Sequence, residues 1–281
     1  IKMPNQRFIE LARRLGEDLL KERSIQPLIT TATTQFTQTP EDIFILSYND
    51  FGKELIQKSN ELFKDTKAEI PLKDRGEVPN MYILKRLALI TTIYNNPQLK
   101  STNLWPITPL QSELLLKENK LHNPEKYWED LALIWYDTSD EGKNPKEAKA
   151  LHESLKQNRD DLNLSNSDLD SKLLIVNPGL EKDSSMPHGV KPIILPGLTE
   201  VYQHETLHKT GKNYEFEYGL QNGLPSVDKL GQGSRTLYMP SEDNNIGLRL
   251  LYRGRDFDLG AWGDGLAYSS AGGRVSFAHQ K

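Results

Sequence analysis

The sequence of 281 residues contains no cysteine. This absence excludes disulfide bonds and thiolate metal sites, and with them a small lectin framework held together by disulfides. It also removes cysteine from the candidate catalytic nucleophiles, and no serine lies in a G-x-S-x-G elbow. The chain is nevertheless long enough, with 36% hydrophobic residues, to bury a core in one large domain or two ordinary ones.

An excess of positive charge is also missing. Lysine and arginine number 35 against 39 aspartates and glutamates, which gives a net charge of −4 and a pI near 5.9. This balance offers no electrostatic basis for binding nucleic acid, so we expect no nucleic-acid partner. The apolar runs are short and no cleavable signal peptide is visible, so we expect no membrane span, although the chain begins at Ile1 and a segment could precede it.

Glycine is scarce in the first half of the chain. Of the 19 glycines, only four precede residue 150: Gly16, Gly52, Gly76 and Gly142. This shift in composition predicts a boundary between a helical domain over residues 1–170 and a second domain over residues 171–281.

Apolar residues recur at helical spacing in the first half. The sets are Phe8, Ala12, Leu15 and Leu19; Phe44, Tyr48, Phe51, Leu55 and Leu62; and Ile83, Leu87, Ile90 and Tyr94. Helices are expected to start where a capping residue precedes proline, at Thr39-Pro40, Thr108-Pro109, Asn123-Pro124 and Asn144-Pro145. Gln111 has capping-box spacing from Thr108. Aromatic residues at 127, 128, 135 and 136 are then expected in a helical core.

The second half has the signals of an α+β domain. A buried strand is expected over residues 173–176 and another over 193–195, followed by a helix over 199–209. Shorter strands are expected over residues 216–218, 236–239 and 246–252. This order of strand, helix, loops and terminal hairpins is not that of a βαβ unit.

The expected helix 199–209 contains an H-E-x-x-H motif. On such a helix His204 and His208 would project from one face toward zinc, with Glu205 as general base, so a zinc-dependent hydrolase is the alternative function. Against it, Tyr214 stands where the longer metzincin pattern has its third histidine. The opposing interpretation is two partly exposed histidines on an amphipathic helix.

The stretch from Gly247 to Phe277 has an unusual composition. Between Asp243 and Gln280 there is no Lys, Glu or Met, and six glycines lie between Gly254 and Gly273. Small residues with a few rigid aromatics are typical of binding surfaces, although an ordinary set of glycine-rich hairpins has the same composition. The three aspartates at 256, 258 and 264 and the three arginines at 253, 255 and 274 are expected to form internal salt bridges.

The segment GLRL, Gly247 to Leu250, resembles a strand near the C-terminus of C-type-lectin-fold domains of the formylglycine-generating-enzyme type. The residues after it resemble the C-terminal variable region of proteins diversified by diversity-generating retroelements, most closely the archaeal (nanoarchaeal) variable proteins. The residues of this frame are Arg253, Arg255, Asp256, Leu259, Leu266, Ala267, Gly273, Arg274 and Val275.

This resemblance implies an α+β protein in which an N-terminal helical domain precedes a C-terminal C-type-lectin-like fold, with a variable region at about residues 250–275. It implies a non-enzymatic ligand-binding protein without catalytic residues, metal or cofactor. Its partner would be an unknown protein or surface ligand of another cell or virus, and display on a cell surface or virion is expected. The implied variable positions are Gly254, Phe257, Gly260, Trp262, Gly263, Asp264, Gly265, Tyr268, Ser270, Ala271 and Gly272.

Retroelements of this kind randomise adenines, so an Asn codon can change to many residue types but never to Lys, Glu, Gln, Met or Trp. Trp262 therefore departs from the pattern of the other positions.

A structural or phage-tail-like receptor-binding component without variation is the remaining alternative.

Overall fold

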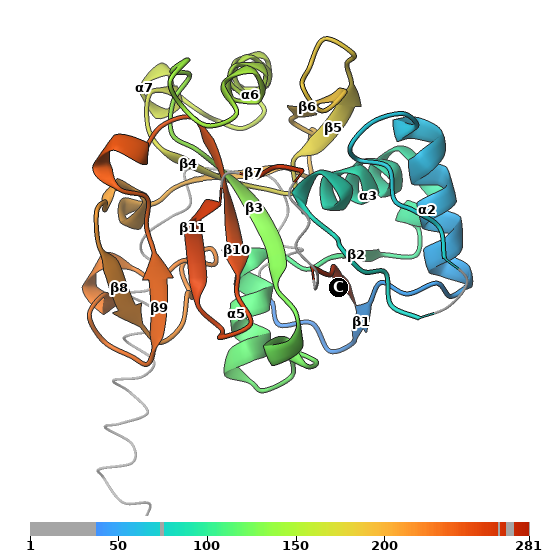
Figure 1. Ribbon diagram of the computed structural model, residues 1–281, viewed down its shortest axis with the longest axis horizontal. Coiled ribbons are helices and arrows are strands. Elements are labelled where there is room, and N and C mark those ends of the chain that lie inside the picture. Colours follow the sequence, from blue (N-terminus) through green and yellow to red (C-terminus); the bar gives the residue numbers. More distant parts are fainter. Residues whose placement is uncertain (1–37, 74–75, 264, 268–272, 281) are drawn as a thin grey trace, which may run out of the picture.

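A computed structural model describes residues 38–73, 76–263, 265–267 and 273–280 (Figure 1). The helices are α2 (Asp50–Phe63), α3 (Ile83–Asn95), α4 (Pro97–Lys100), α5 (Pro109–Lys117), α6 (Pro145–Gln157) and α7 (Asn166–Leu169). The strands are β1 (Ile43–Ile45), β2 (Leu104–Pro106), β3 (Glu129–Trp135), β4 (Leu173–Val176), β5 (Gly179–Lys182), β6 (Val190–Ile193), β7 (Glu200–Gln203), β8 (Asn213–Phe216), β9 (Arg235–Tyr238), β10 (Leu248–Arg253), β11 (Leu259–Gly263) and β12 (Ser276–His279). A large sheet with few helices is consistent with the predicted α+β class.

The large sheet has seven strands in the order β7-β4-β3-β10-β11-β9-β8. All its pairs are antiparallel except β11 with β9, which are parallel. Alternate side chains of β3 enter two separate cores, because successive residues of a strand point to opposite faces. Leu133 and Trp135 belong to one core, and Ala132 and Ile134 belong to the other.

The two faces of this sheet are covered differently. The core that contains Leu133 also contains Leu55 of α2, Leu87 of α3 and Leu151 of α6, so the helices cover that face. In Figure 1, α2 and α3 lie on the right of the sheet, and α6 and α7 lie above it. The opposite core takes its partners from the chain between β7 and β9, through residues that include Leu207 and Leu224.

A second sheet has three strands, with β12 between β1 and β2. Phe277 of β12 is paired with Phe44 on one side and with Pro106 on the other. The backbone continues this pairing beyond the strands, because Leu46 N donates to Val275 O and Ile107 N donates to Ser276 O, at 3.1 and 3.0 Å. The end of the glycine-rich stretch is therefore held from both sides.

Several predicted elements are confirmed. Helix α5 begins with the predicted capping box, because Thr108 Oγ1 accepts from Gln111 N at 3.2 Å and Gln111 Oε1 accepts from Thr108 N at 3.0 Å. Helices α3 and α6 and strands β4, β9 and β10 also lie where residue patterns predicted them. The stripe from Phe8 to Leu19 lies outside the described residues.

Two of the helix starts predicted from proline are wrong. No helix begins at Thr39-Pro40, and Phe44 lies in β1. After Asn123-Pro124 only a short 3-10 turn forms, and the apolar run that follows becomes β3 in the middle of the large sheet. A continuous apolar run of this length suits a strand buried on both faces. The large sheet therefore combines β3 with strands from beyond residue 170, across the predicted boundary.

Candidate ligand-binding site

An open pocket of about 550 Å³ lies beside the turn between β10 and β11. Its lining residues come from four places in the chain: Trp128 before β3, Tyr238 at the end of β9, Tyr252 in β10, and Gly254, Arg255, Asp256 and Asp258 in the turn. In Figure 1 this turn lies at the lower ends of the two strands. The pocket is therefore built largely by the segment for which the sequence predicts a binding surface.

A glycine separates the two tyrosines of the pocket. Tyr252 is paired with Gly260, and Gly260 is paired with Tyr238, so the three residues form a row across β10, β11 and β9. A Cβ atom on Gly260 would lie 2.2 Å from Cζ of Tyr252. The absence of a side chain at Gly260 thus leaves the space that the Tyr252 ring occupies.

The turn itself is fixed by hydrogen bonds. Gly254 N donates to Asp258 O at 2.8 Å, and Phe257 adopts a left-handed conformation with φ of 70°. Asn, Asp and Gly adopt that conformation more readily than Phe does. Oδ1 of Asp258 accepts from Thr236 N at 2.5 Å, which joins the turn to β9.

Charged side chains surround the aromatic rings. The guanidinium carbon of Arg255 lies 5.6 Å from the centre of the Trp128 ring, within the range of a cation–π contact. Arg255 and Asp256 are both exposed, and Asp258 is half-buried. Burial, followed by the charge of Asp258 and a hydrogen bond with it, raises the pKa of Tyr238.

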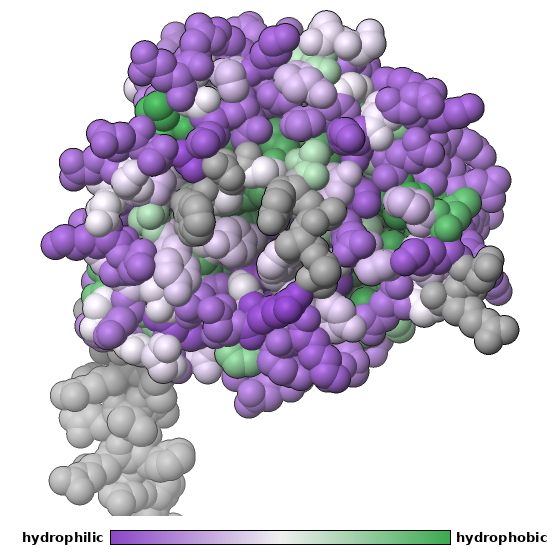
Figure 2. All heavy atoms as spheres, in the orientation of Figure 1, coloured by the Kyte–Doolittle hydropathy of each residue, from purple (hydrophilic) through white to green (hydrophobic). Residues whose placement is uncertain are grey.

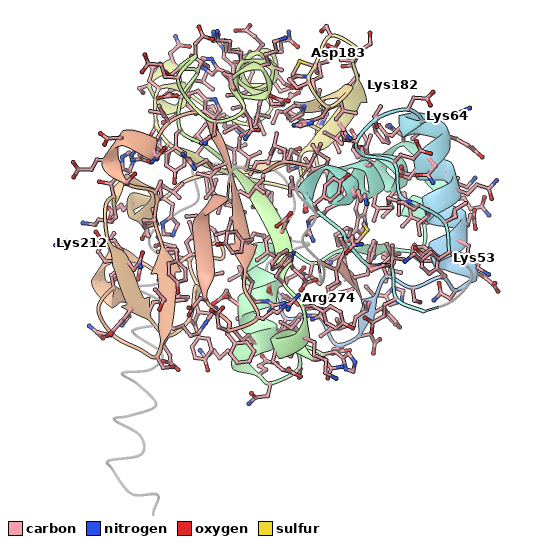
Figure 3. All side chains as sticks on the ribbon, viewed as in Figure 1. Lys53, Lys64, Lys182, Asp183, Lys212 and Arg274 are labelled. Carbon is pink, nitrogen blue, oxygen red and sulfur yellow. The ribbon has the colours of Figure 1, made fainter. Side chains whose placement is uncertain are left out.

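Beneath this turn, Glu129 holds two buried arginines of the predicted frame. Its Oε2 lies 3.0 Å from Nη2 of Arg253 and 3.8 Å from Nε of Arg274, and its Oε1 accepts from Ser276 N at 2.7 Å. Burial alone would raise the pKa of Glu129, but Arg253, Arg274 and these hydrogen bonds outweigh burial and lower it. In Figure 3, Arg274 lies in the middle of the molecule beside the start of β3, whereas Lys53 and Lys212 lie at its outline.

For Arg253 and Arg274, the predicted salt bridges are therefore wrong in their acidic partner. Among the described residues, Arg253 and Arg274 form their ion pair with Glu129 and not with Asp256 or Asp258, and Asp264 lies outside these residues. The available signal was an acidic pair, Glu129-Asp130, at the start of an apolar run, since a buried carboxylate needs a cationic partner.

A second buried ion pair supports the turn from the other side. The carboxylate of Glu113 in α5 accepts hydrogen bonds from both terminal nitrogens of Arg235, from Nη1 to Oε2 at 2.6 Å and from Nη2 to Oε1 at 2.8 Å. Nε of Arg235 donates to Phe257 O at 2.8 Å. This arrangement links α5 through β9 to the turn, and sequence reasoning missed both residues.

The implied variable positions divide into three groups. Gly254 lines the pocket, and Phe257, Gly263 and Gly265 are half-buried. Gly260 is buried under the Tyr252 ring and does not face solvent. Asp264, Tyr268, Ser270, Ala271 and Gly272 lie outside the described residues, as does the side chain of Trp262, whose backbone is in β11.

Several apolar residues of the stretch from Gly247 to Phe277 are buried. They include Leu248, Leu250, Leu259, Leu266, Val275 and Phe277, all at 4% exposure or less. Trp128, which was expected in a helical core, instead lines the pocket and is half-buried. Trp135 and Tyr136 are buried as expected, but Trp135 lies in strand β3 and not in a helix.

The predicted helix over residues 199–209 is wrong. Residues Glu200–Gln203 form β7, which pairs with β4, and Glu205–His208 form a short 3-10 helix. His204 is 3% exposed and uses both ring nitrogens, since Nδ1 accepts from Thr206 N at 3.2 Å and Nε2 lies 3.1 Å from Gln221 O. Because a carbonyl only accepts, Nε2 carries the proton. Burial lowers the pKa of His204 to about 4.

His204 and His208 therefore do not project from one helix face. Within the described ranges, no group of three or more His, Asp or Glu side chains is placed to hold a metal ion. The geometry on which the zinc-hydrolase alternative depends is not formed.

Hydrophilic residues predominate among the described residues visible in Figure 2, with hydrophobic ones scattered between them. In the part of the chain that the structure describes, none of the helices combines the length and the hydropathy needed to span a membrane.

Comparisons with protein-family models, curated proteins and solved structures find no significant match to this chain.

Proposed function

We propose that this chain is a non-enzymatic ligand-binding protein whose C-terminal region presents a hypervariable surface on a C-type-lectin-like fold, diversified by a retroelement. The ligand is a protein or another surface component of a different cell or virus. The pocket beside the β10–β11 turn is part of that surface.

The observation that carries the proposal is the separation of anchored from accessible residues within one short segment. Arg253 and Leu259 are fully buried, whereas Gly254 between them lines the pocket and Phe257 is half-buried. Backbone hydrogen bonds and the two buried ion pairs hold the turn, so its stability depends little on the side chains at its surface. Substitutions at such surface positions usually change the free energy of unfolding by within about 0.5 kcal/mol.

Gly254 and Gly260 respond differently to an added side chain. A Cβ atom on Gly254 would meet Oδ1 of Asp256 at 2.5 Å, which is the end of a side chain that can move. At Gly260 it would meet the Tyr252 ring at 2.2 Å. Variation is therefore expected at Gly254, and at Gly260 only when Tyr252 changes with it.

Two matched libraries test the proposal. One randomises Gly254, Phe257 and Gly265 to Asn, Ser, Tyr and Asp, and the other applies the same residue set to Arg253, Leu259 and Leu266. Folding is scored by resistance to protease, separately from binding. Most members of the first library are expected to fold and most of the second to fail, because removing buried side chains costs roughly 2–5 kcal/mol. Equal failure of both libraries would overturn the proposal.

The flanking DNA gives an independent test. A retroelement requires a near-copy of the segment that encodes residues 252–273, differing from it only at adenines, beside a reverse-transcriptase gene. Differences spread over all four bases would contradict this mechanism.

A further inference from the structure

We propose that the pocket beside the β10–β11 turn binds a cationic side chain, arginine or lysine, presented by a protein partner. This inference rests on the proposed function, because it names the chemistry of the ligand that the hypervariable surface recognises. Aromatic rings, carboxylates and an internal arginine support it separately.

The first support is the number of aromatic rings. Trp128, Tyr238 and Tyr252 all line the pocket, and they come from the segment before β3, from β9 and from β10. The face of an aromatic ring attracts cations, most strongly for tryptophan, and several rings around one space form the cages in which proteins bind quaternary ammonium groups. A cationic side chain can therefore enter without losing all of the stabilisation that water provides.

The second support is the charge of the lining. Among the described residues that line the pocket, there are two carboxylates, Asp256 and Asp258, and one guanidinium, that of Arg255, so the charges of these residues sum to −1. Asp258 is held in place by Thr236 N at 2.5 Å and by a hydrogen bond with Tyr238. Asp256 is exposed, so its carboxylate is accessible to a ligand at the pocket rim. A cation would meet both negative charge and aromatic faces there.

The third support is that the protein already places a cation in the pocket. The guanidinium of Arg255 lies 5.6 Å from the centre of the Trp128 ring. It thus occupies a position that an arginine of a partner would take. Arg255 and the ligand then compete for the same ring, and removal of Arg255 should strengthen binding.

That competition separates a cation site from an anion site. If the ligand were anionic, Arg255 would be its main partner, and Arg255→Gln would abolish binding. If the ligand is cationic, the same substitution removes both a competitor and a repulsive charge.

The experiment titrates the protein with N-acetyl-arginine amide and N-acetyl-lysine amide. N-acetyl-citrulline amide is the neutral control with the shape of arginine, and N-acetyl-glutamate amide is the anionic control. Binding is followed by the indole N–H resonance of Trp128 in a ¹H–¹⁵N spectrum, assigned with Trp128→Phe. The two cationic probes are expected to shift this resonance with millimolar dissociation constants, and citrulline and glutamate amides are expected to leave it unchanged.

Variants then fix the source of the binding. Arg255→Gln is expected to tighten binding of the arginine probe about 2–5-fold, and Asp256→Asn is expected to weaken it by a similar factor, the size of one exposed charge or cation–π contact. Asp228→Asn, at an exposed aspartate outside the pocket, is the matched control and should change nothing.

Equal binding of arginine and citrulline amides, or loss of binding in Arg255→Gln, would overturn the inference. If the library at Gly254, Phe257 and Gly265 folds but no cation binds, this inference fails and the proposed function stands. If cations bind but the library does not fold, the pocket is a fixed cation site and the proposed function fails.

Discussion

Two buried glutamates, Glu113 and Glu129, hold arginines from the C-terminal half of the chain, and they do so in different ways. Glu113 uses both carboxylate oxygens on one arginine, with Nη1 and Nη2 of Arg235 at 2.6 and 2.8 Å. Glu129 instead shares one oxygen, Oε2, between Arg253 and Arg274, at 3.0 and 3.8 Å. Both glutamate side chains are fully buried.

The difference lies in what remains unsatisfied. Arg235 donates its other bonds to the carbonyl oxygens of Phe257 and Glu217. Around Glu129, by contrast, Nε of Arg253 and both Nε and Nη2 of Arg274 have no hydrogen-bond partner among the described residues. All the buried nitrogens of Arg235 have hydrogen-bond partners. The cluster around Glu129 instead has two guanidinium groups for one carboxylate, and some of their nitrogens have no partner among the described residues. Its stability depends on Glu129.

Replacement of Glu129 should therefore have the largest effect. We expect Glu129→Gln to lower the free energy of unfolding by about 3–5 kcal/mol, because two buried arginines lose their charged partner. Denaturant unfolding of the full chain measures this change. Glu125→Gln, at an exposed position shortly before β3, is the control. A loss no larger than that of the control would show that the arginines do not depend on Glu129.

The corresponding change at Glu113 should cost less. We expect Glu113→Gln to lower the free energy of unfolding by about 1.5–3 kcal/mol, since the amide oxygen and two backbone carbonyls still accept from Arg235. The same denaturant measurement applies. If this variant is less stable than Glu129→Gln, the proposed difference between the two sites is reversed.

Asp130, next to Glu129, is expected to make the free energy of unfolding depend on pH. Burial raises its pKa to about 7 from 3.8, although a hydrogen bond from the Ile83 backbone and the charge of Arg86 oppose the shift. Between these two values the folded state keeps a proton that the unfolded state releases, so stability falls as pH rises. Asp130→Asn removes this contribution, and we expect the decrease in unfolding free energy from pH 5 to pH 8 to become smaller.

Asp160→Asn, at an exposed site, is the control for Asp130→Asn. An unchanged pH profile in Asp130→Asn would mean that Asp130 titrates alike in the folded and unfolded states.

The smallest effect is expected at Ser276. Its backbone N–H donates to Glu129 at 2.7 Å, but its hydroxyl is buried without a hydrogen-bond partner in the described part of the chain. Ser276→Ala keeps the backbone bond and removes an unsatisfied group, so we expect no loss of stability and a gain of up to about 1 kcal/mol. Thermal unfolding compares the two proteins. A clear loss would reveal a partner for the hydroxyl.

Local signals predicted helix starts correctly only where the following residues agreed with them. Asn123 and Asn144 both precede proline, and both adopt a left-handed conformation with φ of 43° and 50°. A helix follows Asn144, but strand β3 follows Asn123. The difference comes from the run L-A-L-I-W, which lies in β3 and pairs with β4 on one side and with β10 on the other. Such pairing between distant strands is not contained in a local pattern.

The site was predictable in one part and not in the other. The glycine-rich composition located the turn that lines the pocket, because composition is a local property. Trp128 and Tyr238 reach the pocket only through the pairing of strands, and Glu129 lies 124 residues before Arg253. No spacing rule connects residues at that separation.

The position of β12 between β1 and β2 has a consequence for protein synthesis. A nascent chain contains β1 and β2 long before β12 leaves the ribosome, and each of them pairs with β12 and not with the other. The small sheet therefore closes only after translation of the whole glycine-rich segment. A premature stop codon or frameshift in that segment removes β12 and leaves two strands with unpaired edges, which mark a chain for aggregation or degradation. Translation through β12 is in this way a condition for closing the small sheet.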